Sequence, residues 1–403
     1  MNEVLPAYGG RSFADIPATV VRLLTGSGEG GVADGVLGGL DRRWARVVLV
    51  VVDAFGWSVA ERHAGHPFLR RVAAEGVLAQ LTSQFPSTTS AHMTTLHTGL
   101  PVGASGIYEW FQLEPSLDRL IAPLLFSYAG DPERETLRDS AVDPATLYPH
   151  TTIYERLAEA GVPSSAVQHA AIADTTFSRS TLRGAAVRPF TAGDGWVAEA
   201  ADACAGSAPA YAVVYVDDVD ATGHEHGPSS DAHVAAANAV LDGLESLAGL
   251  LPADGETLLL VTADHGQVQV HPATTIFVNE RRPGLVRHLR HGADGRPLAP
   301  AGSARDLFLH VLPERLDDVV GDLVELLGET ASVRRTADLL AAGVFGDAGP
   351  RLRERVGDVV VLAGPGGTVW WREAGRFDMR FRGHHGGLSP DEMLIPLAAL
   401  PLG

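Results

Sequence analysis

The chain has 403 residues, of which 45% are hydrophobic, and a formal net charge of −18. This length and composition are typical of one large globular core with an elaboration, and the negative charge excludes a protein that binds duplex nucleic acid by neutralising its phosphates. All 31 basic residues are arginine, which excludes mechanisms that depend on a lysine, such as a Schiff base or a P-loop.

Unbroken apolar runs that alternate with helical patterns predict the core. Residues 46–52, RVVLVVV, are typical of a strand buried on both faces of a parallel sheet, and residues 210–216 and 257–263 have the same character. This alternation predicts an α/β fold with a doubly wound, mostly parallel sheet. The helical patterns fall at residues 16–24, 68–76, 151–161 and 231–251.

The character of the sequence changes after residue 275, where arginine and proline become denser. Two weaker strand patterns, at residues 307–312 and 359–362, flank a helical pattern at residues 316–327. A strand–helix–strand series of this kind predicts a smaller α+β cap inserted into the core.

The expected organisation therefore has three parts. The catalytic core occupies residues 1–275, and within it an irregular segment, residues 108–148, is expected to lie over the same edge of the sheet as the cap. The cap occupies residues 276–379. The chain then returns to the core at residues 380–403, which end in an apolar strand pattern at residues 393–400.

A hydroxyl-rich turn, residues 85–89 (FPSTT), stands directly before a short helical pattern that ends at Gly99. A hydroxyl in the first turn of a helix lies in a field that favours an alkoxide and binds phosphate. A lone hydroxyl at this position is usually a helix cap. The interpretation of Thr89 as a nucleophile therefore depends on other residues of the chain.

Three aspartates follow the predicted strands. Asp53 and Asp264 come directly after two of them, and Asp220 lies four residues beyond the third. In open α/β sheets, ligands bind beyond the carboxyl ends of the strands, so these carboxylates are expected to converge. Histidines accompany them at His224, His265, His384 and His385.

Aspartates and histidines together make a coordination set for two divalent metal ions, and zinc favours both ligand types. Two metals about 3.5–4 Å apart can clamp an attacking and a leaving oxygen. The charges also balance: three aspartates and a threonine alkoxide match the charge of two zinc ions with three neutral histidines. Such a site keeps Thr89 deprotonated without a neighbouring general base.

As an ordered series, these motifs resemble the alkaline phosphatase superfamily, and within it the nucleotide pyrophosphatase/phosphodiesterase branch. The resemblance implies an alkaline-phosphatase-like core in which the threonine attacks phosphorus in line, forms a phospho-threonine, and is released by water. It implies one zinc site at Asp220, His224 and His385, and a second at Asp53, Asp264, His265 and the Thr89 oxygen. His385 is preferred to His384 because the family ligand directly precedes a glycine. The motifs are Asp53, residues 85–89, 98–100 (TGL), 220–224 (DATGH), 264–266 (DHG) and 383–386 (GHHG).

Two positions depart from the pattern of that branch. His92 stands where the family has an asparagine three residues after the nucleophile, and Trp110 stands where a second asparagine donates to a phosphate oxygen. Tyr108 and Trp110 are candidates for stacking on a base or aryl group of the substrate, with packing in the core as the alternative. The expected substrate is a small phosphate ester, nucleotide-like or aryl.

Other reactions use the same core. A phosphomonoesterase differs only in what accommodates the second ester group. Phosphonate hydrolases of the superfamily hold a substrate carboxylate with lysines, and this chain offers only arginine. A sulfatase would need Cys-x-Pro-x-Arg, a context that Cys204 lacks, and a phosphomutase relative would use serine. A catalytically silent relative is disfavoured because the ligand set is complete.

Cys204 is the single cysteine, so no intrachain disulfide can form and a reducing compartment is expected. The first residues have no basic segment followed by an apolar core, and the longest apolar runs are too short to span a bilayer. We therefore expect a cytoplasmic protein without a membrane partner. The sequence leaves the oligomeric state open.

Overall fold

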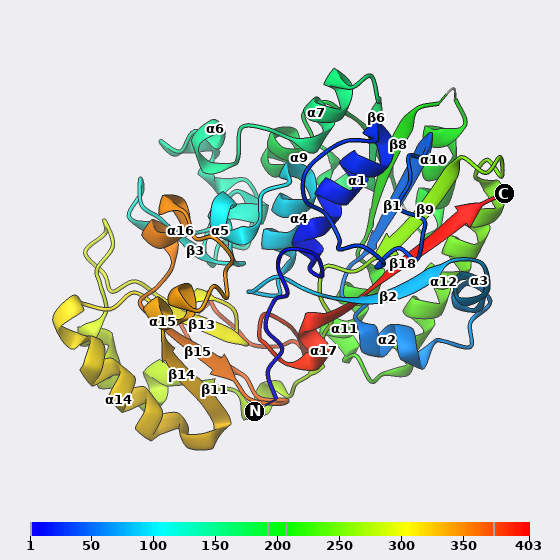
Figure 1. Cartoon of the computed structure of the whole chain (residues 1–403). Helices are drawn as coiled ribbons and strands as arrows, with labels where there is room; N and C mark the ends of the chain where they lie inside the picture. Colours follow the sequence, from blue (N-terminus) through cyan, green and yellow to red (C-terminus); the bar gives the residue numbers. More distant parts are fainter. Residues whose placement is uncertain (1, 192, 207, 374) are drawn as a thin grey trace.

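The computed structural model describes residues 2–191, 193–206, 208–373 and 375–403, and a seven-stranded sheet forms its centre. The strand order is β2-β18-β9-β1-β8-β6-β7 (Figure 1). Neighbouring strands from β9 to β7 are parallel, and β18 runs antiparallel to both β2 and β9. The strands are β1 (Arg46–Val52), β2 (Val77–Thr82), β6 (Ser164–His169), β7 (Ala185–Phe190), β8 (Ala210–Val216), β9 (Thr257–Thr262) and β18 (Leu394–Leu402).

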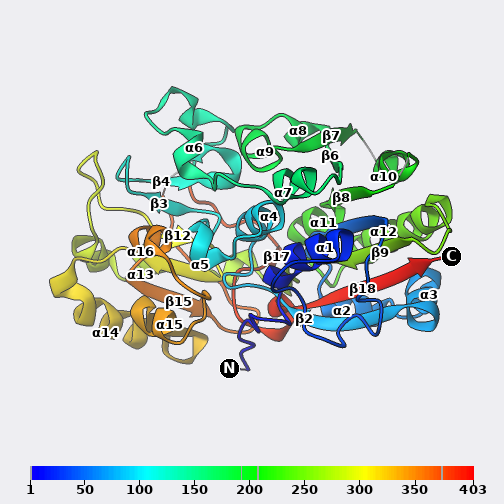
Figure 2. The same cartoon turned by 45° about the horizontal axis from the view of Figure 1, so that its top comes forward.

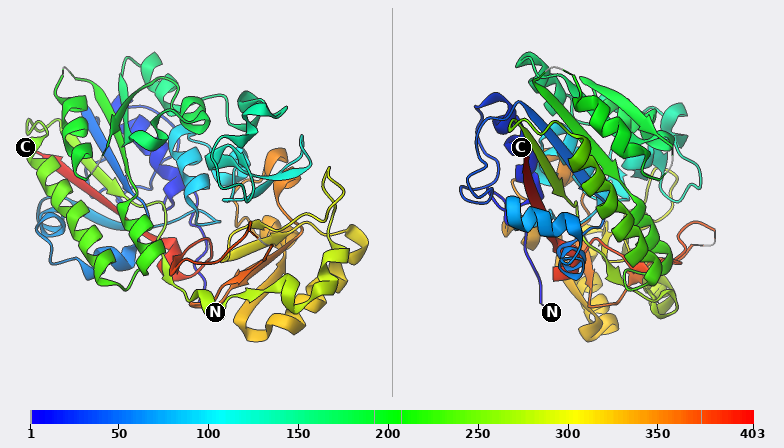
Figure 3. Two further views of the ribbon diagram at one scale, coloured as in Figure 1. Left: turned by 180° about the vertical axis from the view of Figure 1, so that it is seen from behind. Right: turned by 90° about the vertical axis from the view of Figure 1, so that its right-hand side faces the viewer.

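Helices cover both faces of this sheet (Figure 3). One layer contains α3 (Pro67–Glu75), α10 (Gly195–Cys204) and α12 (Asp231–Leu250), and the opposite layer contains α1 (Ile16–Thr25), α4 (Thr89–Thr98) and α7 (Ile153–Glu159). Because β1 is covered on both sides, residues 47–52 are buried throughout. No helix of the described residues is long and apolar enough to cross a membrane.

A smaller antiparallel sheet lies beside the core, in the order β12-β13-β15-β14. Together with α14 (Leu316–Leu327) and α16 (Pro350–Arg355) it forms the cap, and α4 lies between the cap and the large sheet (Figure 2). The structure also contains a three-stranded sheet and two two-stranded sheets. The strands are β12 (Ala301–Gly302), β13 (Asp306–Leu309), β14 (Ala331–Arg335), β15 (Val359–Ala363), β3 (Gln112–Glu114), β4 (Arg119–Ala122), β5 (Ser127–Tyr128), β10 (Val268–Gln269), β17 (Gly383–His384), β11 (Ile276–Phe277) and β16 (Val369–Trp370).

The predicted α/β fold with a mostly parallel sheet and a smaller cap is confirmed. Strand β13 ends three residues earlier than the predicted strand at 307–312, and β2, β6, β7, β12 and β14 were not predicted. The edge strand β7 has mostly exposed or half-buried residues and contains Pro189, so it lacks the apolar run that marks a central strand. The domain boundaries at residues 276 and 380 remain predictions.

Candidate active site

Thr89 is the first residue of α4, and Thr88 caps the helix with extended backbone. Every residue of α4 is buried, because the helix is enclosed between core and cap. The Thr89 hydroxyl lies 3.3 Å from Asp53 Oδ2 and 3.2 Å from His265 Nε2. The sequence-predicted nucleophile therefore contacts a predicted carboxylate ligand and a predicted imidazole ligand.

Asp53 and Asp264 meet because β1 and β9 are adjacent parallel strands whose carboxyl ends lie at one edge. His265 Nε2 lies 3.4 Å from Asp53 Oδ1 and 3.3 Å from Asp264 Oδ2. Asp264 Oδ1 accepts hydrogen bonds from the backbone N–H groups of Ala54 and His265, at 3.2 and 2.9 Å. Tyr215, near the end of β8, donates to Asp53 Oδ2. Asp53 Oδ1 and Asp264 Oδ2 have no hydrogen-bond partner among the described residues.

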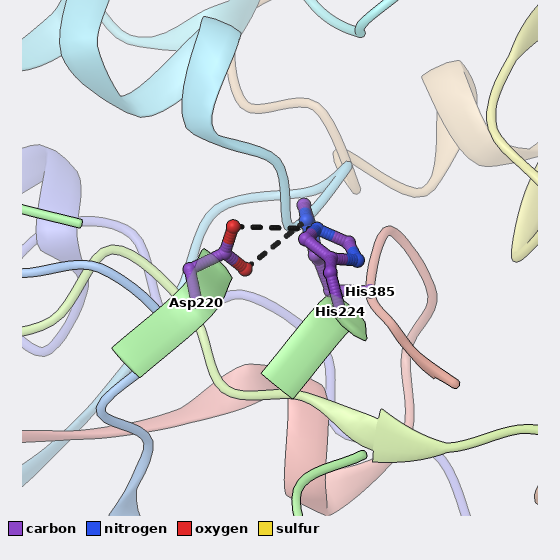
Figure 4. A group of neighbouring side chains, drawn as sticks. All are labelled: Asp220, His224 and His385. Carbon is purple, nitrogen blue, oxygen red and sulfur yellow. Dashed lines mark ion pairs between the residues drawn. The ribbon is translucent and has the colours of Figure 1, made fainter. Parts of the chain in front are cut away.

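A second group joins α11 (Asp218–His226) to the chain after β17 (Figure 4). Asp220 and His224 stand four residues apart on the helix and so share one face. Asp220 Oδ2 lies 3.3 Å from His224 Nε2, and Asp220 Oδ1 lies 3.8 Å from His385 Nε2. Figure 4 shows the carboxylate pointing at both imidazole rings.

The three imidazoles are oriented in the same way. His224 Nδ1 lies 2.8 Å from the Gly383 carbonyl oxygen, His265 Nδ1 3.1 Å from that of Gly266, and His385 Nδ1 2.8 Å from that of Ser87. A carbonyl can only accept, so each Nδ1 carries a proton, and each Nε2 is the ring nitrogen that faces the carboxylates and is left to bind a metal ion. Hydrogen bonding of this kind is typical of histidines that hold a metal.

The buried carboxylates resist ionisation when no cation balances them. Burial, together with the charges of Asp264 and Asp220, raises the pKa of Asp53 well above its ordinary value, and burial raises the pKa of Asp264 to about 7. Burial lowers the pKa of His265 and of His385 well below the ordinary histidine value, so both rings are neutral at pH 7. Unpartnered carboxylate oxygens beside neutral imidazoles are a donor set that fits divalent cations.

Two groups of side chains have ligand atoms close enough to hold a cation. One consists of Asp220, His224 and His385, and the other of Asp53, Asp220 and His265, with the ligand atoms of each group within 4.8 Å of one another. The structure therefore places Asp220 between both groups, whereas the sequence assigned it to the first alone. Asp264 lies beside the second group through its contact with His265.

Two cavities meet at Thr89. The sheet-side cavity, about 250 Å³, is lined by Asp53 and by residues of the chain around β6, β8 and α11. The cap-side cavity, about 290 Å³, is lined by His224, His385 and residues of the cap. Thr89, Trp110 and Asp220 line both.

The two aromatic residues expected at the substrate have different positions. Trp110 lines both cavities. Tyr108 is fully buried in the hydrophobic core of the cap, where its ring packs edge-on against Phe308 at 5.2 Å between centroids, and it lines neither cavity. Tyr108 therefore has a packing role, and we leave it out of the substrate site.

His92, at the position of the family asparagine, holds the turn before Thr89. Its Nε2 accepts the Gln84 backbone N–H at 2.9 Å and lies 2.8 Å from Ser83 Oγ, and its Nδ1–H donates to the Thr88 carbonyl at 2.7 Å. Burial lowers the pKa of His92 to about 4, which keeps the ring neutral and able to make both kinds of hydrogen bond. Its contacts are those of a structural residue.

Two residues of the site were not singled out in the sequence. Tyr215 contacts Asp53, and its signal is a polar aromatic residue one position before the end of a predicted strand. Gln267 Nε2 donates to Asp220 Oδ1 at 2.8 Å, and its signal is its place three residues after Asp264. Both orient carboxylates of the candidate metal groups.

The sequence matches the family described as type I phosphodiesterase / nucleotide pyrophosphatase over residues 47–388. Murine ectonucleotide pyrophosphatase/phosphodiesterase 5 has a similar structure, with a TM-score of 0.66 at 19% identity over 88% of this chain and 87% of that chain. The structure of an inactive variant of the same murine protein, in complex with AMP, has a TM-score of 0.65 at 18% identity over 88% of each chain.

A phosphonoacetate hydrolase from Sinorhizobium meliloti 1021, in complex with phosphonoformate, gives a TM-score of 0.64 at 16% identity, over 89% of this chain and 90% of that chain. At these identities the likeness to solved structures shows the fold. No curated protein matches the sequence. Because the family match spans most of the chain and contains every residue of the candidate site, the chain belongs to the type I phosphodiesterase / nucleotide pyrophosphatase family of the alkaline phosphatase superfamily.

Proposed function

We propose that the protein is a zinc-dependent phosphodiesterase that acts through a covalent phospho-threonine at Thr89. The observation that carries the proposal is that Thr89 lines two cavities. A phosphodiester has two ester groups besides the reacting phosphorus, and each cavity offers space for one of them. A phosphomonoesterase would need only one such cavity.

Asp220, His224 and His385 would hold one divalent cation, and Asp53, Asp264, His265 and the Thr89 oxygen the other. A ligand set that combines carboxylate oxygens with imidazole nitrogens favours zinc. When bound, the two cations lower the pKa of the threonine hydroxyl and neutralise charge on the phosphoryl oxygens. The contacts of the Thr89 hydroxyl with Asp53 and His265 support this role, because they would orient the attacking oxygen toward phosphorus.

The reaction divides into two balanced halves. Thr89 Oγ1 attacks phosphorus, the bond from phosphorus to the leaving ester oxygen breaks, and the proton lost by Thr89 ends on the leaving alcohol. Water then attacks the phospho-threonine, the bond to Oγ1 breaks, and a phosphate monoester leaves as Thr89 regains a proton. Because Thr89 is the first residue of α4, the positive end of the helix dipole would lie at a phosphoryl group that Thr89 attacks.

The test is hydrolysis of an aryl phosphodiester and the matching aryl phosphomonoester by zinc-loaded wild type and Thr89→Ala. We expect the diester to be the better substrate, and Thr89→Ala to lower its kcat/KM by about 1,000-fold or more. Thr94→Ser, on the same buried helix, is the matched control and should remain within about 3-fold of wild type. Faster turnover of the monoester would favour the phosphomonoesterase.

Phosphonate hydrolysis is a second candidate. An arginine lines each cavity, Arg134 on the sheet side and Arg376 on the cap side, where it could meet a substrate carboxylate in place of a lysine. The similarity to phosphonoacetate hydrolase supports the fold for this reaction. Phosphonoacetate in the same assay decides the matter: turnover above that of the diester, lost in Arg134→Ala or Arg376→Ala, would favour phosphonate hydrolysis.

A further inference from the structure

The two cavities reach different parts of the site. Asp53 lines only the sheet-side cavity, whereas His224 and His385 line only the cap-side cavity. The hydroxyl of Thr89 contacts Asp53 and His265, so the attacking oxygen belongs to the Asp53 side. In an in-line displacement the leaving oxygen lies on the side of phosphorus opposite the attacking oxygen. The leaving oxygen would therefore lie on the side of His224 and His385.

We infer that the cap-side cavity is the leaving-group subsite and that it selects a phosphodiester with an apolar aromatic leaving alcohol, in preference to a nucleoside triphosphate that releases pyrophosphate. The inference rests on the proposed function of Thr89 and names the substrate class of the same site. The sheet-side cavity then holds the ester group that stays on phosphorus.

Aromatic rings form the wall of the cap-side cavity. Phe111 stacks on Trp370 with 6.3 Å between ring centroids and an interplanar angle of 18°. Phe377 meets Phe111 edge-on at 5.5 Å. Phe381 lies 4.6 Å from the His224 ring, so an aromatic surface reaches the candidate metal ligand itself. An aryl alcohol leaving from phosphorus beside His224 would be surrounded by these rings.

The charges of this cavity do not suit pyrophosphate. Among the described residues that line it, Arg376 is the one arginine. Its guanidinium already lies 3.3 Å from Glu373 and donates to the Ala129 carbonyl at 2.7 Å. Asp378 adds a negative charge to the lining, and Arg380, whose guanidinium is 5.9 Å from the Phe381 ring centroid, does not line the cavity. Beyond the candidate cation site at His224 and His385, a pyrophosphate group would therefore meet only an arginine whose charge is already paired with Glu373.

Two substrates that share the retained group isolate the leaving group: the 4-nitrophenyl ester of thymidine 5′-monophosphate and thymidine 5′-triphosphate. In Phe381→Ala, kcat/KM for the aryl ester should fall about 10-fold, whereas that for the triphosphate should change less than about 3-fold. Phe381 is 36% exposed, so this truncation leaves the core packed. Phe381→Arg should raise kcat/KM for the triphosphate because it adds a cation.

Phe177→Leu is the matched control. Phe177 lines the sheet-side cavity, so its truncation should change kcat/KM for both substrates by the same factor. A second measurement needs no turnover and uses calorimetric titration of 4-nitrophenol into the Thr89→Ala protein. Adding Phe381→Ala should raise the Kd for 4-nitrophenol about 10-fold, whereas adding Phe177→Leu should leave the Kd unchanged.

The outcomes separate the two claims. A higher kcat/KM for the triphosphate than for the aryl ester, or equal effects of Phe381→Ala on both, would overturn the leaving-group assignment while Thr89-dependent hydrolysis stands. If Thr89→Ala hydrolyses the aryl ester as fast as wild type, the proposed function falls, and the leaving-group assignment falls with it. Selective loss of the aryl ester in Phe381→Ala supports both.

Discussion

His265 and His385 stack face to face, with ring centroids 3.7 Å apart and an interplanar angle of 13°. One ring belongs to the group around Asp53 and the other to the group around His224. Because these two rings are stacked and Asp220 belongs to both groups, the two candidate cation sites are neighbours that share one carboxylate. Loss of Asp220 is therefore expected to weaken both sites, whereas loss of a ligand that belongs to one group should weaken that site alone.

The shared position of Asp220 leads to a metal-content prediction. Asp220→Asn should lower the bound zinc from about two ions per chain to less than one, because the carboxylate borders both groups. His224→Ala should leave about one ion, because its ring lies in one group only. Elemental analysis of purified protein after dialysis against buffered zinc measures both.

His226→Ala is the control for this series, because His226 lies on the same helix and pairs with Glu225 outside the candidate groups. It should keep the wild-type zinc content. An Asp220→Asn protein that retains two tightly bound ions, with activity intact, would contradict the placement of Asp220 between the sites.

The raised pKa values of the buried carboxyls predict how pH affects the metal-free protein. Burial raises the pKa of Asp264 to about 7 and that of Asp53 well above its ordinary value, and burial raises the pKa of Glu109 to about 8. The folded chain then binds more protons than the unfolded chain, so stability falls as pH rises through these values. The buried histidines, with lowered pKa values, act in the opposite sense below about pH 6.5 and are neutral in both states above about pH 7.

The Tm of chelator-treated protein should therefore fall by about 5 °C between pH 6.5 and pH 8, the range that ends at the raised pKa values of Asp264 and Glu109, and zinc should restore most of the loss. In Asp264→Asn the fall should be smaller, since one titrating carboxyl is gone. A metal-free Tm that stays level or rises over this interval would contradict the buried charge at the site.

A buried ion pair holds the turn that carries His385. Arg305 and Glu392 are 1% and 0% exposed and form two contacts of 2.9 Å, and Glu392 also accepts the Gly387 N–H at 3.0 Å. Arg305→Met leaves the Glu392 carboxylate buried without its partner and should lower the free energy of unfolding by about 3–5 kcal/mol. Urea unfolding followed by circular dichroism measures the change.

Arg372→Met provides the comparison, because Arg372 pairs with Glu280 where both side chains are about half exposed. Arg372→Met should lower the free energy of unfolding by less than about 1 kcal/mol. Equal losses of unfolding free energy in the two variants would show that the buried Arg305–Glu392 pair does not stabilise the turn that carries His385.

The central strands could be predicted from sequence because burial on both faces forces a continuous apolar run, as in β1, β8 and β9. Strand β6, SSAVQH, is too polar for that signal. Helix α11 was not predicted either, because only Val219 and Gly223 of it are buried and its sequence has no apolar stripe.

The candidate site residues could be named from sequence because Asp53, Asp220 and Asp264 follow strand patterns, and because Thr89 and His385 match motifs of the family. The position of Asp220 in both groups could not be predicted. It depends on how α11 packs against β17, and no local sequence pattern records that packing. The same holds for Tyr108 and Trp110. The two aromatics lie two positions apart, and only the packing of the cap sends one into its core and the other to the cavities.

The central claim is that Thr89 becomes covalently phosphorylated during turnover. Zinc-loaded wild type mixed with excess aryl phosphodiester, quenched in acid within the first turnover and digested, should yield a peptide in which Thr89 Oγ1 carries the phosphoryl group with its retained ester. The adduct should be absent from Thr89→Ala. Turnover that produces no adduct in wild type and continues at an undiminished rate in Thr89→Ala would contradict the account.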